Sequence, residues 1–299
     1  MNKGSEHKTT QRSVPFILHE SRSQFDWKGQ GALSLKTFRH GTTLYEAGHG
    51  HFTVGQERYL LLNASQEYQL HIDSPVPVES FCVFFPPGFV EEVNRSVSSN
   101  DLNLLHEPYA SSTPLTLDWV ERTYPMGDHL GTAIERLRSS YISPLTDPWE
   151  LEEQLHQLAL HMLVLRHEIR SEMHALDAAK SSTREELYRR VYIGHEYMAA
   201  YYDQAITLTE TASAAHLSVN HFLRSYKKLF GISPHQFLTE RRLQAARKLL
   251  VDTDLPVTDI CLSVGFESPG SFSSLFTKRF HLPPSLYRKK GDFEEALPN

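Results

Sequence analysis

The chain has 299 residues, of which 40% are hydrophobic and 22% charged, and a formal net charge of −6. This composition is typical of a globular protein with room for two or three domains. No run of 18 apolar residues occurs and the polar N-terminus lacks a signal-peptide core, so we expect a cytoplasmic protein that does not enter a membrane. Its two cysteines, Cys82 and Cys261, have no metal-type spacing, which fits a reducing compartment.

Residues 13–112 have the pattern of a β-rich domain. Short runs rich in β-branched and aromatic residues alternate with turn residues, and such spacing predicts a small barrel or sandwich. The runs are Leu33–Arg39, His51–Gly55, Arg58–Asn63, Glu67–Ile72 and Val78–Phe85. A barrel of this size has an interior that can hold a small organic effector.

A histidine pair lies within this β-rich region. His49 and His51 are two residues apart, and on a strand both side chains would point to one face, with Glu57 close behind. A third histidine would be needed, but Glu91 follows the next proline-glycine turn. Because the chain holds 17 histidines, we favour loop or strand-edge histidines and expect no cofactor, with a metal site of His49, His51 and Glu57 as the alternative.

Two helices are predicted over about 115–140 and 148–177. The second carries apolar residues in a 4-3-4-3-4 spacing, namely Leu151, Leu155, Leu158, Met162, Leu165 and Ile169. That spacing suits the seam of a helical dimer, and it equally suits a helix that packs on its own barrel. Region 113–177 is therefore assigned as helical, with dimerisation expected, and the small polar residues of 178–184 are assigned as a linker.

A repeated segment follows in the last third of the chain. Residues 50 apart match, and both copies begin with a serine suited to cap a helix. An aromatic residue then recurs at every fourth position, which predicts one buried stripe in each copy. The matched pairs are Ser218 and Ser268, Phe222 and Phe272, Tyr226 and Phe276, Lys228 and Lys278, Phe230 and Phe280, and Pro234 and Pro284.

Each copy is preceded by a short segment of helical composition, at 208–217 and 257–264. Gly265 ends the second of these segments and suits a left-handed turn into the next helix. A short helix, a tight turn and a capped helix form a helix-turn-helix, which the sequence predicts twice. The face opposite the first aromatic stripe carries Asn220, Leu223, Arg224 and Lys227, whose chemistry suits base edges and phosphates.

These repeats resemble the DNA-binding domain of the AraC/XylS family of transcriptional regulators. The resemblance covers about residues 185–291 and includes Ala212, Arg224, Gly231, Ser233-Pro234, Arg241, Ala245, Leu249-Leu250, Ile260, Gly265-Phe266, Ser271 and Tyr287-Arg288. It implies two helix-turn-helix subdomains joined by a long helix over about 234–251, and an N-terminal cupin-like barrel as sensor. The expected fold class is therefore α+β, a cupin-like β-barrel with helices followed by an all-α domain.

Carried over by position, the resemblance gives the candidates for reading bases. They are Asn220, Leu223 and Arg224 in the first repeat and Gly270, Ser271, Ser273 and Ser274 in the second. The second set lacks a long hydrogen-bonding side chain, so we expect it to contribute phosphate positioning and shape readout. His281 replaces the glycine found at Gly231, which predicts a differently built turn at that helix end.

Charge follows the same division of the chain. Region 185–291 holds 14 basic and 10 acidic residues, whereas the rest holds 16 basic and 26 acidic residues. Such asymmetry supports nucleic-acid binding despite the negative total. The phosphate-contact candidates are Ser218, Lys227, Lys228, Ser268, Lys278 and Arg279, together with the run Arg288-Lys289-Lys290.

Three functions fit these patterns. The first is a homodimeric activator of transcription that binds double-stranded DNA, responds to a small-molecule effector in the barrel and contacts RNA polymerase. The second is a cupin-type enzyme with a metal in the barrel, against which the missing third histidine counts. The third is a regulator controlled by a protein partner instead of a small ligand. The first is preferred, so no catalytic residue is assigned.

Overall fold

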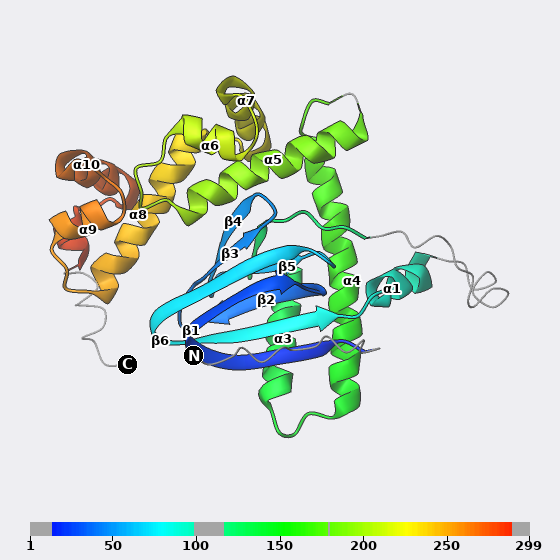
Figure 1. Cartoon of the computed structure of the whole chain (residues 1–299). Helices are drawn as coiled ribbons and strands as arrows, with labels where there is room; N and C mark the ends of the chain where they lie inside the picture. Colours follow the sequence, from blue (N-terminus) through cyan, green and yellow to red (C-terminus); the bar gives the residue numbers. More distant parts are fainter. Residues whose placement is uncertain (1–13, 99–116, 179, 289–299) are drawn as a thin grey trace. The chain divides into compact units, whose positions relative to one another are not determined.

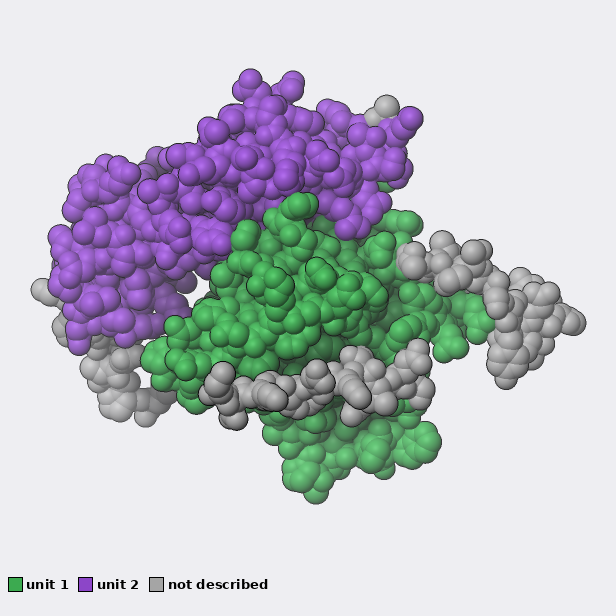
Figure 2. Space-filling model, in the orientation of Figure 1, with its two compact units in different colours: residues 1–174 green, residues 175–299 purple. Residues whose placement is uncertain are grey.

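The computed structural model describes residues 14–98, 117–178 and 180–288. It divides into two compact units, residues 1–174 and 175–299, which Figure 2 shows in different colours. Within the described ranges, no helix is both long enough and apolar enough to cross a bilayer.

The first unit is built on an antiparallel sheet (Figure 1). Its path is β4-β3-β6-β2-β5-β7, and β1 pairs with β6 beside this path. The end strand β4 lies close to β5 and β7, so the sheet curls into a nearly closed barrel. The strands are β1 Phe16–Gln30, β2 Leu33–Arg39, β3 Thr43–Ala47, β4 Gly50–Val54, β5 Arg58–Leu62, β6 Glu67–Phe85 and β7 Thr123–Pro125.

Three of the predicted β-runs appear with bounds within about a residue of those expected, and the other two are one strand. β6 continues through Ser74-Pro75-Val76-Pro77, where its two prolines fall on a stretch that does not pair with β2 or β3. β1 and β3 were not predicted. β1 pairs with β6 at the side of the sheet and is half-exposed. Its sequence is largely polar, so its apolar alternation is weak.

Along each strand, side chains that point into the barrel alternate with side chains that point toward the helices. The interior holds a buried cluster that includes Phe38, Phe52, Leu62, Tyr68 and Cys82. The other side faces α3 (His129–Ile142), whose Arg138 donates to the Thr37 hydroxyl at 2.5 Å. The Phe81 ring of β6 lies 5.9 Å from the Tyr141 ring of α3. One sheet thus supports two cores.

The helix predicted over 115–140 begins later than expected. Residues 117–122 are not helical, β7 follows, and α3 starts only after Asp128, whose carboxylate accepts from the Gly131 N–H at 2.6 Å. The Asn63 side chain holds the backbone of Trp119 by accepting from its N–H at 2.8 Å and donating to its carbonyl at 2.9 Å. These tertiary bonds keep the segment extended. Residues 115 and 116, and the predicted boundary at 112–113, lie outside the described residues.

Helix α4 (Pro148–Met173) carries the apolar stripe that was considered for a dimer seam. Leu158, Met162, Leu165 and Ile169 are buried within the first unit, each with at most 4% of its surface exposed. α4 packs with α3 and with α1 (Phe89–Ser98), a helix that was not predicted. This is the alternative in which the helix covers its own domain, and it leaves no free seam at these four positions. Leu151 and Leu155 are half-buried.

The second unit is helical throughout its described part (Figure 1). Helix α5 begins at Ser181, inside the predicted linker. Its first turn consists of the polar serines and threonine that had been assigned to that linker. The helices are α5 Ser181–Ala200, α6 Leu208–Ala214, α7 Val219–Phe230, α8 Pro234–Asp252, α9 Val257–Ser263 and α10 Pro269–Phe280. α8 is the long helix that the resemblance implied between the two helix-turn-helix pairs.

Candidate nucleic-acid interface

The first helix-turn-helix consists of α6 and α7. Thr207 caps α6 in a capping box with Glu210, and each side chain bonds to the backbone of the other. The turn after α6 contains His216 at φ 50°, and the Leu217 N–H donates to the Ala212 carbonyl at 2.9 Å. That six-to-one bond is a Schellman motif, which turns the chain toward α7. A histidine therefore takes a backbone conformation that glycine adopts more easily.

The second helix-turn-helix, α9 and α10, has the same turn with one added residue. Gly265 at φ 87° takes the role of His216, and the Phe266 N–H donates to the Cys261 carbonyl at 3.0 Å. Glu267 is the added residue before the capping Ser268. A Cβ at Gly265 would lie 2.9 Å from the carbonyl oxygens of Tyr202 and Asp203, so glycine is required here by both space and conformation.

The two recognition helices are capped by serines, as predicted. The Ser218 hydroxyl accepts from the His221 N–H at 3.4 Å, and the Ser268 hydroxyl accepts from the Ser271 N–H at 3.4 Å. Both serines are exposed, so the caps leave the N-terminal ends of α7 and α10 at the surface. Helix N-termini with free backbone N–H groups suit phosphate oxygens.

The turn after α10 corrects an expectation. His281 has φ 63° and its N–H donates to the Thr277 carbonyl at 2.8 Å, while Gly231 has φ 73° and its N–H donates to Lys227 at 2.9 Å. The two helices therefore end in the same left-handed turn, and the prediction of a differently built turn was wrong. The reason is that one residue in the left-handed region costs only about 1–2 kcal/mol, which surrounding contacts can offset.

The predicted reading face of α7 lies on the surface. Asn220, Arg224 and Lys227 are exposed and Leu223 is half-buried, while Phe222 and Tyr226 are fully buried on the opposite side. The Arg224 guanidinium donates through Nε to the Asn220 carbonyl of its own helix at 3.4 Å. An amide, a guanidinium, an aliphatic group and an ammonium thus share one strip.

On α10 the corresponding face consists of small residues. Gly270, Ser271 and Ser274 are exposed, and Ser273 is half-buried, with its carbonyl accepting from the Thr277 hydroxyl at 2.7 Å. Phe272 and Phe276 form the buried stripe, as predicted. This face lets a DNA backbone approach closely but offers no long side chain to a base.

Two of the phosphate candidates have carboxylate partners within the second unit. Lys228 pairs with Asp177, and Arg279 donates through Nε to both oxygens of Glu240 on α8, at 2.9 and 2.8 Å. The bond from Arg279 holds the pKa of Glu240 below its usual range. Lys227 and Lys278 are exposed, and positions 289 and 290 lie outside the described residues. Glu240 and Asp177 were not identified from sequence, because nothing local marks a partner 39 or 51 positions away.

Arg242 of α8 has an internal role. Its Nε donates to the Tyr202 carbonyl at 2.6 Å and its guanidinium to the Gln204 carbonyl at 2.8 Å, in the segment that follows α5. The same segment faces Gly265 in the second turn. Arg242 thereby connects α5, α8 and the second helix-turn-helix.

A polar and aromatic cluster supports α7 from behind. The His195 ring of α5 bonds to the Tyr226 hydroxyl at 3.0 Å and lies 4.6 Å from the Phe230 ring and 4.2 Å from the Phe237 ring. Burial raises the pKa of Tyr226 well above its usual range, so its hydroxyl stays neutral. Contacts of this kind fix the helix that carries the reading face.

The metal alternative depended on His49 and His51 sharing one strand face. His49 lies instead in the turn between β3 and β4, after Gly48 at φ 57°, while His51 is on β4 with Nδ1 3.7 Å from a Glu46 oxygen. Across the described ranges, no three histidine, cysteine, aspartate or glutamate residues come together in a way that would hold a metal.

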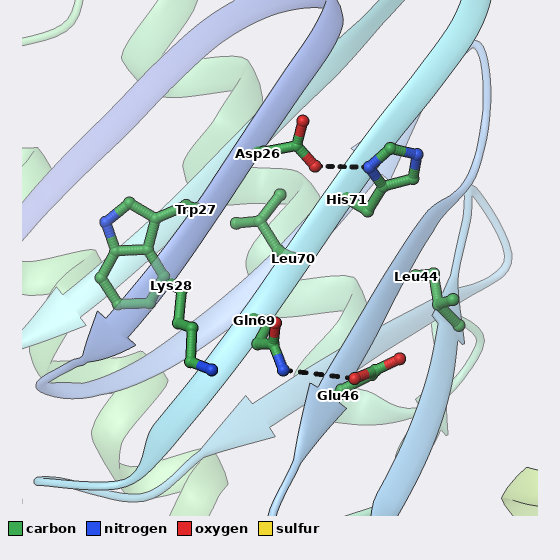
Figure 3. Close-up of a pocket in the computed structure, with 8 residues that line it drawn as sticks. All are labelled: Asp26, Trp27, Lys28, Leu44, Glu46, Gln69, Leu70 and His71. Carbon is green, nitrogen blue, oxygen red and sulfur yellow. Dashed lines mark hydrogen bonds and ion pairs between the residues drawn. The ribbon is translucent and has the colours of Figure 1, made fainter. Parts of the chain in front are cut away.

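A shallow hollow of about 490 Å³ lies on the outer side of the first unit, over β1, β3 and β6 (Figure 3). The His71 ring contacts an Asp26 oxygen at 2.5 Å, and Gln69 donates to Glu46 at 3.3 Å. The bond to Asp26 raises the pKa of His71. Asp26 and Glu46 thus already have partners within the hollow.

Two capped helix-turn-helix pairs joined by α8 define a helix-turn-helix protein of the bipartite kind. Residues 211–290 match the helix-turn-helix domain family. The chain is 29% identical over 173 residues to the melibiose operon regulatory protein of Escherichia coli K12, covering 53% of this chain and 57% of that protein. It is 41% identical over 92 residues to the transcriptional activator NphR of a Rhodococcus species, covering 30% of this chain and 26% of that protein.

Among solved structures, the chain is similar to the C-terminal domain of AraT, a response regulator from Geobacillus stearothermophilus. The identity is 30%, the match covers 34% of this chain and 84% of that one, and the TM-score is 0.33. The protein therefore carries a helix-turn-helix domain similar to those of the matched regulators, as the resemblance to the AraC/XylS family implied. It spans little more than half the length of the melibiose regulator it matches, and about a quarter of the Rhodococcus activator.

Proposed function

We propose that this protein is a sequence-specific regulator of transcription that binds double-stranded DNA through α7 and α10 and acts in the cytoplasm. The observation that carries the proposal is the surface of α7, where an exposed amide, guanidinium and ammonium share one strip behind a serine cap. Arginine and asparagine side chains recognise guanine and adenine edges in the major groove.

The two recognition helices have unequal roles in this proposal. The α7 strip reads bases through Asn220, Leu223 and Arg224, whereas the small residues Gly270, Ser271, Ser273 and Ser274 of α10 bring the backbone close to the groove. Backbone and shape contacts of this second kind position a protein on DNA with little base discrimination. The caps at Ser218 and Ser268 and the exposed Lys227 and Lys278 supply phosphate contacts. Lys228 and Arg279 join them only when their carboxylate partners release them.

Activation, contact with RNA polymerase and a homodimeric state belong to the same proposal. A matched relative is named as a transcriptional activator, which favours activation. A dimer would use a surface other than the buried stripe of α4. The first unit would act as the sensor, because the mouths of β-barrels are common sites for small molecules. Control by a protein partner at the same unit is the alternative.

An enzymatic function has weaker support. The residues that would have formed the metal site are separated, with His49 in a turn and His51 facing Glu46. The melibiose operon protein and NphR, which the chain matches, are named as regulators.

The test is selection of preferred sites from random duplex DNA with the full-length protein, followed by measurement of affinity. Arg224→Ala should weaken binding to the selected site by about 1–3 kcal/mol and relax the preference at the base pairs it reads. Lys248→Ala, on the exposed face of α8, is the control and should leave the preference unchanged. If Arg224→Ala weakens selected and random DNA equally, Arg224 contacts phosphate only. If no sequence is enriched, the proposed function fails.

A further inference from the structure

A lysine lies inside the barrel of the first unit. Lys36 is on β2, opposite Leu60 of β5 and Cys82 of β6, and both partners belong to the interior cluster. Paired residues of neighbouring antiparallel strands share one face of the sheet, so the Lys36 side chain points inward. Only 2% of its surface is exposed. A buried ammonium without a counter-charge is costly, so its presence calls for an explanation.

Lys36 has no carboxylate partner among the described residues; the Glu20 carboxylate of β1, which acts on Cys82, pairs with Arg22 at 2.8 Å. None of the ion pairs found among the described residues includes it. The groups that face it from β3 and β6 are Tyr45, Tyr68 and Cys82, and burial raises the pKa of all three, so they stay neutral. Burial correspondingly lowers the pKa of Lys36 to about 8, and around neutral pH the amine still carries its proton for most of the time.

Aromatic rings surround the ammonium and lead outward from it. The Lys36 Nζ lies 3.8 Å from the Phe84 ring centre and 5.4 Å from that of Tyr68. The Phe16 ring stacks on Phe84 at 4.6 Å, and the Trp27 ring lies 4.3 Å from Tyr68. We call Phe16, Trp27, Tyr68 and Phe84 the aromatic wall. Three of its members are half-buried, so the wall runs from the surface at β1 to the buried ammonium.

Two hydroxyl groups on the inward faces of β2 and β3 also lack partners. The Ser34 Oγ and the Thr43 Oγ1 are buried without a hydrogen bond. Ser34 shares the inward face of β2 with Lys36 and is the cross-strand partner of Phe84. Thr43 lies on the buried face of β3 with Tyr45. Buried hydroxyls are normally satisfied, so the orphaned Ser34 hydroxyl beside the uncompensated Lys36 cation points to an absent acceptor.

We infer that the barrel binds a small organic acid with an apolar body, its carboxylate at Lys36 and its apolar part along the aromatic wall. The inference rests on the proposed sensor role of the first unit and names the chemical class of its effector. A carboxylate supplies the missing charge and can accept from the ammonium and the Ser34 hydroxyl. An apolar body packs on rings that are now only half-buried.

The experiment compares carboxylates with their uncharged alcohols, using calorimetric titration of the full-length protein. The probes are butanoate, hexanoate, octanoate and phenylbutanoate, each beside the alcohol with the same carbon skeleton. At least one carboxylate should bind about tenfold or more tightly than its alcohol, a difference of about 1.4 kcal/mol. Lys36→Met should remove that difference, and Lys28→Met, an exposed lysine on β1, should retain it. In the unmodified protein the difference should shrink as pH rises through about 8.

The outcomes separate this inference from the proposed function. If no carboxylate is preferred to its alcohol, or if the preference survives Lys36→Met, the inference is overturned. DNA affinity is measured on the same samples without a probe. Specific DNA binding together with no carboxylate preference would overturn the effector class alone, whereas absent DNA binding would count against the regulator. Thermal unfolding of Lys36→Met verifies that the variant is folded.

Discussion

At the scale of single residues, the end of α10 shows how a local rule can be overruled. Glycine is favoured at a left-handed helix terminus because a Cβ is strained there. His281 nevertheless takes φ 63° at the position where Gly231 takes φ 73°. The two repeats thus provide a strained and an unstrained copy of one turn in the same protein.

We expect His281→Gly to stabilise the second unit by up to about 1 kcal/mol, since relief of the strain exceeds the added entropy of the unfolded chain. Gly231→Ala is the matched reverse change and should destabilise by about 1 kcal/mol. No atom lies within 4 Å of a Cβ at Gly231, so its cost is conformational alone. Urea unfolding measures both. A destabilised His281→Gly would show that the imidazole makes a contact that outweighs the strain.

Lys36 gives a second prediction at this scale. Its pKa falls from the ordinary 10.5 to about 8 in the folded protein, which corresponds to a cost of about 3 kcal/mol while the amine is protonated. Between these pH values the unfolded chain binds more protons than the folded one, so stability rises with pH across that interval. The destabilisation is complete below about pH 8 and lost above about pH 10.5.

Without ligand, Lys36→Met should therefore be more stable than the unmodified protein by up to about 3 kcal/mol near neutral pH, and by much less near pH 10.5. Lys28→Met serves as the control and should show no such pH-dependent gain. Denaturant unfolding at several pH values provides the measurement. A loss of stability in Lys36→Met at neutral pH would mean that its contacts with Phe84 and Tyr68 outweigh desolvation.

At the scale of elements, α4 distinguishes a core helix from an interface helix. Leu165 is 4% exposed, whereas the adjacent Val164 is 49% exposed. The heptad spacing is the same for both uses of such a helix, since any stripe of this period can cover another helix, a sheet or a second chain. Burial within one unit decides between them.

Leu165→Asp should destabilise the first unit by more than about 3 kcal/mol, because it buries an unpaired carboxylate. Val164→Asp, one position away, should cost less than about 1 kcal/mol. Thermal unfolding of both variants tests the difference, with sedimentation velocity run in parallel. If the unmodified protein is a dimer and Leu165→Asp is a folded monomer, the α4 stripe forms a subunit interface instead.

At the scale of the whole molecule, helix α8 of the second unit is the spacer between the two recognition helices, α7 and α10. Arg242 bonds the segment after α5 to α8, and that segment packs against the turn at Gly265. Glu240 and Arg279 connect α8 directly to α10. With both helix-turn-helix pairs held to one long helix, the distance between the two DNA half-sites should be fixed.

Insertion of half a helical turn, about five base pairs, between the selected half-sites should therefore remove the contribution of one reading helix. The expected loss of affinity is about tenfold or somewhat more. A base pair that is read contributes about 1–3 kcal/mol to binding, and the small residues of α10 place its contribution near the lower limit. Insertion of a full turn, about ten base pairs, should not restore affinity. Fluorescence anisotropy with the three duplexes is the measurement. Unchanged affinity with either insertion would show that the two subdomains bind independently.

The local sequence pattern predicted the repeated helix-turn-helix pairs, their serine caps and the strands β2, β4 and β5. These features depend on residues within one or two turns of each other, such as Ser218 and Phe222, so the local pattern carries them. It also predicted the exposed strip of Asn220, Arg224 and Lys227, because the opposite side of a helix with a buried aromatic stripe faces outward.

The features that depend on residues far apart in the chain could be seen only in the folded protein. The extended segment at Trp119 is held by Asn63, and the use of the α4 stripe depends on what packs against it. The engagement of Arg279 and Arg242 follows from partners about 40 positions away. The inward direction of Lys36 follows from its register with Cys82. Side-chain environment is set by pairing and packing between distant segments, and no local pattern records it.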